Sequence, residues 1–227
     1  MFIEMPELVD IGQTLLNAAV FNLKSNENSS IAAHAMIPNH VEEFLDLLKE
    51  NEVDCVLVGG LAMLSHLEGR NTQDIDLIVG LKEIRELPGI EISENDEHFA
   101  LAAFKTLRVD ILRAEFRFFR TIKENHSEVR PFADREISCA TPLGLILMKL
   151  FALPVLYRQF LTSKVTIYEG DIQNLLAQFP TPHAEIVKLL QPHVPTSELK
   201  ELESILTEIE GRIERMSSNR FGYPESD

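Results

Sequence analysis

The sequence of 227 residues lacks any long apolar run. A membrane-spanning helix needs about 18 or more consecutive apolar residues, and no stretch comes near that length. The first ten residues, MFIEMPELVD, carry acids where a secretory signal peptide carries basic residues. We therefore expect a cytoplasmic protein without a membrane partner.

Cysteine is scarce, with two residues in the chain. Cys55 and Cys139 each lie in an apolar segment with strand character, and neither belongs to a C-x-x-C pair or has a histidine at metal-ligand spacing. This usage predicts buried free thiols in a reducing compartment. The seven histidines are scattered along the chain and do not suggest a zinc site.

Basic residues are also few, with 21 lysines and arginines against 36 aspartates and glutamates and a net charge of −15. A general nucleic-acid surface is therefore not expected, because phosphate contacts need clustered positive charge. Between residues 101 and 135 the balance reverses, and the basic residues there are Lys105, Arg108, Arg113, Arg117, Arg120, Lys123, Arg130 and Arg135. This stretch is either a phosphate-facing surface or a solvated sheet edge.

A glycine pair follows the first apolar run of the central stretch, residues 53–79. The run Asp54–Val58 predicts a strand, and Leu61, Leu64 and Leu67 then recur at helical spacing. Gly59 and Gly60 would let backbone N–H groups approach a ligand, and a helix N-terminus favours negative charge. The pattern predicts a polyphosphate site, and a tight strand-to-helix turn without a ligand is the alternative.

Two aspartates begin the next predicted strand. Residues two apart in a strand face the same side, so Asp74 and Asp76 project together while Ile75 and Leu77 face the core. Two adjacent carboxylates favour a cation between them, and Mg²⁺ prefers oxygen ligands while keeping positions open for substrate phosphates. The alternative is an exposed edge strand with two solvated acids.

A third acid, Asp110, interrupts the apolar strand predicted over Leu107–Leu112. A carboxylate in such surroundings is costly without a cation. Either a metal ion supplies this cation, or the carboxylate pairs with Arg108 or Arg113.

The combination of a strand, G-G-x-A, a helix and G-R-x-T-x-D-I-D-L resembles the nucleotidyltransferase superfamily with the DNA polymerase β type of fold, over residues 53–113. Within that superfamily it looks most like the AbiEii-type toxins, a group of minimal nucleotidyltransferases. The resemblance implies an α+β fold, in which a polymerase β-like core of a small mixed sheet with helices precedes a helical C-terminal lobe. It also implies a third catalytic carboxylate on a later strand, and Asp110 is the best match.

The activity implied by this resemblance is Mg²⁺-dependent transfer of a nucleoside monophosphate from an NTP, such as ATP, to a hydroxyl acceptor. Asp74, Asp76 and Asp110 would be catalytic and hold two Mg²⁺ ions about 3.5–4 Å apart. Gly59 and Gly60 would cradle phosphate, and Arg70 and Thr72 are further candidates for contacts with phosphate or acceptor.

The sequence does not specify the acceptor. The toxin-like resemblance favours tRNA or protein and implies a small antitoxin protein as partner. A small-molecule acceptor, as in aminoglycoside-type enzymes, is one alternative. Another is a non-catalytic partner-binding protein that kept the fold.

From Thr141-Pro142 onward the chain predicts helices, beginning with a helix over Leu143–Leu153. Lys149 lies within its apolar sequence, and Asp171 precedes another helical pattern. By resemblance these two residues match a lysine and an aspartate of AbiEii-like proteins that serve the nucleotide site. The alternatives are a lysine that extends to solvent along an apolar face and an aspartate that caps a helix N-terminus.

The remaining patterns predict three regions, an N-terminal helix and loop over 1–38, a nucleotidyltransferase core over 39–140 and a helical lobe over 141–227. Helices are expected over 7–23, from Asn39, over 182–191 and over 197–216, and a loop over 24–39. Strands are expected over Phe99–Lys105 and Leu107–Leu112, with one or two more in Arg117–Lys123 and Val129–Ala140. Leu199, Leu202, Leu206, Ile209, Ile213 and Met216 form an apolar stripe that favours packing within the lobe.

Overall fold

The computed structural model describes residues 31–67, 74–132 and 135–220. The helix predicted over 7–23 and the loop containing Arg70 and Thr72 lie outside these residues. Contacts divide the chain into two units, Met1–Thr141 and Pro142–Asp227, and each is described by itself.

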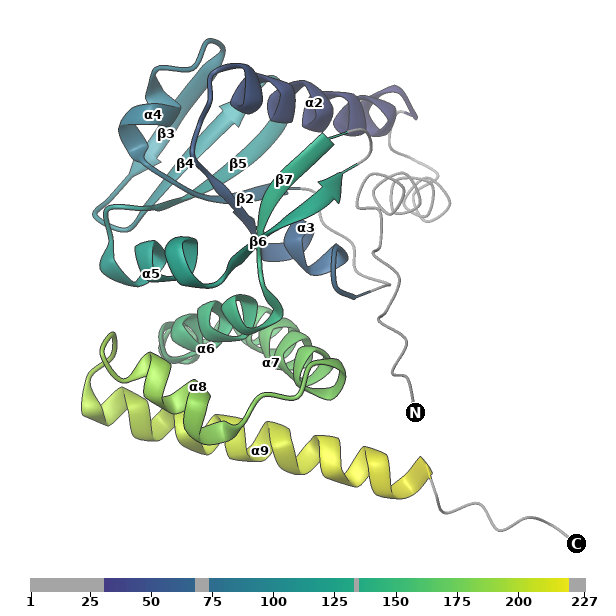
Figure 1. Ribbon diagram of the computed structural model, residues 1–227, viewed down its shortest axis with the longest axis vertical. Helices are drawn as coiled ribbons and strands as arrows, with labels where there is room; N and C mark the ends of the chain where they lie inside the picture. Colours follow the sequence, from purple (N-terminus) through teal and green to yellow (C-terminus); the bar gives the residue numbers. More distant parts are fainter. Residues whose placement is uncertain (1–30, 68–73, 133–134, 221–227) are drawn as a thin grey trace, which may run out of the picture. The chain divides into compact units, whose positions relative to one another are not determined.

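The first unit contains a seven-stranded mixed sheet in the order β3-β4-β5-β2-β1-β7-β6 (Figure 1). Its strands are β1 Val56–Val58, β2 Asp74–Val79, β3 Ile90–Asn95, β4 Phe99–Phe104, β5 Leu107–Arg113, β6 Ser127–Phe132 and β7 Arg135–Ala140. Its helices are α2 Ile31–Glu50, α3 Gly59–Leu64, α4 Leu81–Arg85 and α5 Arg117–Asn125. The pairs β2–β5 and β1–β7 are parallel, and the others are antiparallel. The predicted α+β fold is confirmed, with a sheet wider than the small one expected.

The core of this unit lies on one face of the sheet, to which every second residue of β2 and β5 contributes a buried apolar side chain. On β5, Val109 and Ile111 are buried, and on β2, Ile75 and Leu77 are buried. Helix α2 packs here through Phe44, whose ring centroid lies 5.5 Å from that of Phe104 on β4. Because side chains alternate along a strand, burial of these residues directs the aspartates of β2 and β5 to the other face.

Three local expectations for the first unit are wrong. Segment 117–123, expected as a strand, belongs to helix α5, because Phe118, Phe119 and Ile122 share one buried helical face. Strand β3 was not expected, since its alternate positions are only half-buried in an edge strand rich in acids. Helix α2 begins at Ile31, so part of the predicted loop over 24–39 is helical.

The second unit consists of helices in the described residues (Figure 1): α6 Pro142–Arg158, α7 Thr162–Gln178, α8 His183–Leu190 and α9 Thr196–Arg220. On α9, Leu202, Leu206 and Ile209 are buried, and this helix contacts α6, α7 and α8. The middle of the apolar stripe on α9 therefore packs within the unit, whereas Met216 at its end is 61% exposed. Among the helices described, none is both long enough and apolar enough to cross a membrane.

Candidate active site

The parallel pairing of β2 with β5 brings the three predicted aspartates together. Asp76 is the register partner of Asp110, and Asp74 is the register partner of Arg108. Neighbouring strands lie about 4.8 Å apart, and residues two apart on one strand share a face. Three carboxylates and one guanidinium therefore form two adjacent rows, which we call the aspartate cluster: Asp74, Asp76, Arg108 and Asp110.

Gly59 makes room for one member of this cluster. Its φ of +63° lies in the left-handed region, and a Cβ at this position would lie 1.9 Å from Oδ2 of Asp76. Any side chain here would displace the Asp76 carboxylate, and the backbone conformation itself favours glycine. The phosphate contact of Gly59 expected from the sequence stays a prediction, and the structure adds the close approach of Asp76 to this glycine. Gly60 is buried in the first turn of α3.

Arg108 binds Asp110 with two hydrogen bonds. Its Nε donates to Oδ1 at 2.7 Å and its Nη2 donates to Oδ2 at 3.0 Å. Of the two arginines considered as partners of Asp110, Arg108 is therefore the one that pairs with it. Arg113 instead donates to the backbone oxygen of Asp96 at 2.5 Å and lies 3.6 Å from Glu115.

The charges of the cluster act on one another. The hydrogen bond and the charge of Asp110 raise the pKa of Arg108 above its usual value, and the charges of Asp74 and Asp76 add to this effect. The guanidinium is thus stabilised by all three carboxylates. It is one cation held by the aspartate cluster, and we call it the resident cation.

The donor set suits Mg²⁺, which takes oxygen ligands and is commonly held by one or two carboxylates. Asp74 and Asp76 face the same side, and the Asp76 carboxylate occupies the space that a side chain at Gly59 would fill. Across the residues that the structure describes, however, no group of three or more His, Cys, Asp or Glu side chains is arranged to hold a metal ion. Both oxygens of Asp110 accept hydrogen bonds from Arg108, so a metal ion that approached this acid would meet the guanidinium.

The face that carries the cluster becomes apolar farther along the strands. Ile78 and Leu112 are register partners that continue it, and Ile78 is buried. Phe99 pairs with Leu112, and its ring centroid lies 5.4 Å from that of Phe119 on α5. Helix α5 thus packs at the apolar end, and the cluster occupies the opposite end of the face.

Lys149 and Asp171 meet inside the helical unit. Nζ of Lys149 lies 2.7 Å from Oδ2 of Asp171, and their side chains are 6% and 11% exposed. The ammonium also lies 4.5 Å from the ring centroid of Tyr168. The extension of Lys149 to solvent is therefore wrong. The N-cap interpretation of Asp171 is also wrong, because this residue lies well inside α7.

Sequence reasoning missed the roles of Arg108 and Tyr168. Arg108 was one of two arginines considered as partners of Asp110, and its position two residues earlier on the same strand was the available signal. Tyr168 lies one helical turn before Asp171 on α7, but this spacing carries information only once the extent of α7 is known.

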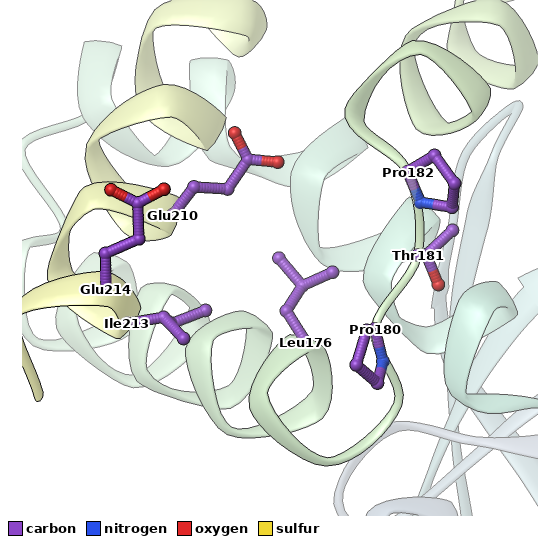
Figure 2. Close-up of a pocket in the computed structure, with 7 residues that line it drawn as sticks. All are labelled: Leu176, Pro180, Thr181, Pro182, Glu210, Ile213 and Glu214. Atoms are coloured by element: carbon purple, nitrogen blue, oxygen red, sulfur yellow. The ribbon is translucent and has the colours of Figure 1, made fainter. Parts of the chain in front are cut away.

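A pocket of about 460 Å³ lies elsewhere in the helical unit. Figure 2 shows the carboxylates of Glu210 and Glu214 on one side and the two prolines on the other. Its lining residues are Leu176, Pro180, Thr181, Pro182, Glu210, Ile213 and Glu214. Oε2 of Glu210 lies 2.9 Å from Nδ1 of His183. Of the predicted site residues that the structure describes, none lines this pocket.

The two cysteines are free thiols, as predicted; Cys139 is buried and Cys55 is half-buried. Burial raises the pKa of each to about 12, so both stay protonated at neutral pH. Neither thiol is therefore a nucleophile of this site.

A buried histidine, His66, links segments of the first unit. Its Nε2 lies 2.9 Å from the backbone oxygen of Ala140, and Nη2 of Arg130 lies 3.0 Å from its Nδ1. A ring that donates from Nε2 and accepts at Nδ1 is neutral. Burial lowers the pKa of His66, and the charge of Arg130 acts in the same direction.

The sequence matches no protein-family model, and no curated protein matches it. Solved structures of similar fold include the following three. ANT(2'')-Ia in complex with adenylyl-2''-tobramycin is 15% identical, with a TM-score of 0.41 over 76% of this chain and 95% of that one. The solution structure of the antibiotic-resistance factor ANT(2'')-Ia is also 15% identical, with a TM-score of 0.41 over 80% and 96%. An antigenic nucleotidyltransferase-like protein from Paracoccidioides brasiliensis is 13% identical, with a TM-score of 0.44 over 88% and 95%.

Of these three, one is described as a nucleotidyltransferase-like protein, and another holds adenylyl-2''-tobramycin. At these identities the likeness concerns the arrangement of helices and strands.

Proposed function

We propose that this protein is a Mg²⁺-dependent nucleotidyltransferase that moves a nucleoside monophosphate from an NTP to a hydroxyl group. The observation that supports this most directly is the register of β2 and β5, which places Asp76 beside Asp110 and leaves Asp74 on the same face. Gly59 adds a second support, since its missing side chain accommodates the Asp76 carboxylate.

Asp74, Asp76 and Asp110 would hold the metal ions. When bound, Mg²⁺ activates the acceptor hydroxyl and stabilises the leaving pyrophosphate. The buried residues Ile75 and Leu77 anchor β2, so Asp74 and Asp76 are held in a fixed orientation without reorganisation. Asp110 is anchored in the same way by its buried neighbours on β5, and it is available after Arg108 releases it.

Contacts to the triphosphate would come from Gly60 and from the loop containing Arg70 and Thr72. Lys149 is a further candidate, with Asp171 as the partner that orients its ammonium. Because that pair is buried within the helical unit, its contribution to nucleotide binding requires a test separate from folding.

A macromolecular acceptor, tRNA or protein, is the first candidate because of the toxin-like motif G-R-x-T-x-D-I-D-L. In this case a small antitoxin protein would bind the chain and block its activity. Expression without the antitoxin should slow growth, and expression of Asp76→Asn should not. Equal growth of the two strains would overturn the toxin role while leaving nucleotidyl transfer intact.

A small cationic acceptor is the second candidate, and the strand next to the cluster favours it. Ala103 pairs with both Arg108 and Glu91, and Leu101 pairs with both Asp110 and Glu94. Across the sheet from the aspartate cluster, Ala103 and Leu101 of β4 are therefore followed by Glu91 and Glu94 of β3, which are both exposed. Acids at this position attract amines and repel the phosphates of an RNA.

One experiment tests the activity and separates the acceptors. The purified chain is incubated with Mg²⁺ and each α-labelled NTP, together with total tRNA, lysate protein or a panel of aminoglycosides. We expect label in one acceptor class, and a rate at least about a hundredfold lower for Asp76→Asn, which corresponds to about 2.7 kcal/mol. Glu124→Gln, which removes an exposed acid on α5, is the matched control and should retain the rate. Absence of transfer to all acceptors, or equal rates for wild type and Asp76→Asn, would overturn the proposal.

A further inference from the structure

The contact between Arg108 and Asp110 differs from an incidental surface ion pair. It uses two parallel hydrogen bonds, of 2.7 and 3.0 Å, so both carboxylate oxygens are engaged. Such paired contacts between a guanidinium and a carboxylate are stronger and more directional than a single bond. The oxygens that a metal ion would need are the ones that Arg108 holds.

Arg108 also places its positive charge beside the other carboxylates of the cluster. In the register of β2 and β5, Arg108 lies beside Asp74, and Asp110 lies beside Asp76. The guanidinium therefore neutralises part of the negative charge that would otherwise attract a divalent cation. A metal ion and Arg108 compete for the same carboxylates.

Exposure makes this contact exchangeable. The side chain of Arg108 is 59% exposed and that of Asp110 is 28% exposed. Water can hydrate the guanidinium as soon as it leaves, and exposed ion pairs of this kind contribute little net stability. The paired hydrogen bonds thus orient the Asp110 carboxylate, and because both groups are exposed to water, opening the contact costs little free energy.

We propose that Arg108 is a built-in competitor of the metal ion, and that a divalent cation completes the three-carboxylate site only by displacing Arg108 from Asp110. This inference rests on the metal site of the proposed function. Arg108 is therefore a positioning residue, which keeps Asp110 oriented toward the cluster before the metal arrives. It also sets the concentration of divalent cation at which the site fills.

Binding of Mn²⁺ to the purified full-length chain tests the proposal without requiring the acceptor. Mn²⁺ takes the same oxygen ligands as Mg²⁺, and its free form gives an electron paramagnetic resonance signal that decreases on binding. Wild type is compared with Arg108→Gln, Arg108→Lys, Asp110→Asn and Arg85→Gln. Arg85 is an exposed arginine of α4 in the same unit, so its loss controls for net charge.

We expect Arg108→Gln to bind Mn²⁺ about three- to tenfold more tightly than wild type, where tenfold corresponds to about 1.4 kcal/mol. Arg108→Lys keeps the charge but loses the paired hydrogen bonds, so its affinity should fall between the two. Arg85→Gln should bind as wild type does. In the Asp110→Asn background, the Arg108→Gln change should lose most of its effect, because the contested carboxylate is gone.

The outcomes separate the two proposals. If wild type binds Mn²⁺ and Arg108→Gln binds it equally or more weakly, the competition is overturned and the metal site remains. If Arg85→Gln gives the same gain as Arg108→Gln, the effect is one of net charge and the competition is also overturned. If neither wild type nor Arg108→Gln binds Mn²⁺ with or without an NTP, the metal site of the proposed function fails as well.

Discussion

In the described part of each unit, a cation pairs with a carboxylate at a predicted site position, and these two pairs differ in burial. Arg108 and Asp110 on the sheet are 59% and 28% exposed, whereas Lys149 and Asp171 in the helical unit are 6% and 11% exposed. The shortest distance is 2.7 Å in both pairs. Geometry alone therefore does not distinguish them.

Burial determines what each pair can do. A charge exposed to water is stabilised by hydration when its partner leaves, so the Arg108 contact can open. A buried charge that loses its partner is stabilised by neither water nor an opposite charge. The Lys149–Asp171 pair is therefore a fixed part of the helical unit, and the Arg108–Asp110 pair is a reversible one.

Removal of the buried cation should have the largest effect. Lys149→Met preserves much of the apolar stem but leaves the Asp171 carboxylate buried, and we expect a loss of about 3–5 kcal/mol in the free energy of unfolding. Urea denaturation followed by circular dichroism measures this loss. A double variant with Asp171→Leu should recover most of it, because no charge is then left unpaired.

Arg158→Gln is the matched control in the same unit. Arg158 pairs with Glu198 at 3.0 Å, but their side chains are 53% and 28% exposed. We expect a change within about 1 kcal/mol. A loss equal to that of Lys149→Met would show that burial does not separate the two kinds of pair.

Replacing one glycine in each unit by alanine should give the next largest difference in stability. Gly59→Ala places a methyl group against the Asp76 carboxylate at a positive φ, and we expect a loss of about 1–3 kcal/mol in stability together with a loss of transfer activity. Gly170→Ala adds a methyl group to helix α7 with nothing within 4 Å, and should stabilise the chain by up to about 1 kcal/mol. Thermal unfolding of both variants decides the matter; equal effects would contradict the close contact at Gly59.

The polar face of β2 was predictable from the sequence because it depends only on neighbouring residues of the same strand. Alternation of Asp74, Ile75, Asp76 and Leu77 fixes which side chains share a face, and burial of the apolar ones fixes the direction. The register of β2 with β5 is not local. It joins residues more than thirty positions apart, and no spacing in the sequence specifies that Asp76 lies beside Asp110 and not beside Arg108.

The contact between Lys149 and Asp171 is also one that local sequence does not specify. Lys149 and Asp171 were both selected, but their contact depends on how α6 packs against α7 and on where α7 begins. Asp171 was predicted as a helix start, whereas α7 begins at Thr162. A sequence that mixes polar and apolar residues, TSKVTIYEG, carries no clear helical period, so the first half of this helix was not recognised.

The buried histidine of the sheet unit predicts a pH effect of intermediate size. The lowered pKa of His66 means that the folded chain keeps a neutral ring while the unfolded chain takes up a proton below about pH 6.5. The associated stability is complete above that pH and is lost as the pH falls through the folded pKa. Melting temperatures between pH 7 and pH 5 should fall more steeply for wild type than for His66→Gln. Parallel curves would remove His66 as a source of acid sensitivity.

The smallest effect is expected at the exposed pair itself. In the absence of divalent cations, Arg108→Gln removes the resident cation of the aspartate cluster, but water hydrates Asp110, so we expect a loss of at most about 1 kcal/mol in the free energy of unfolding. Added salt should reduce the difference from wild type, because screening weakens the repulsion among the remaining carboxylates. Arg108→Gln combined with Asp110→Asn should unfold as wild type does. A loss of about 3 kcal/mol or more for Arg108→Gln would place this pair in the same class as Lys149 and Asp171, and it would then be too stable for a metal ion to exchange.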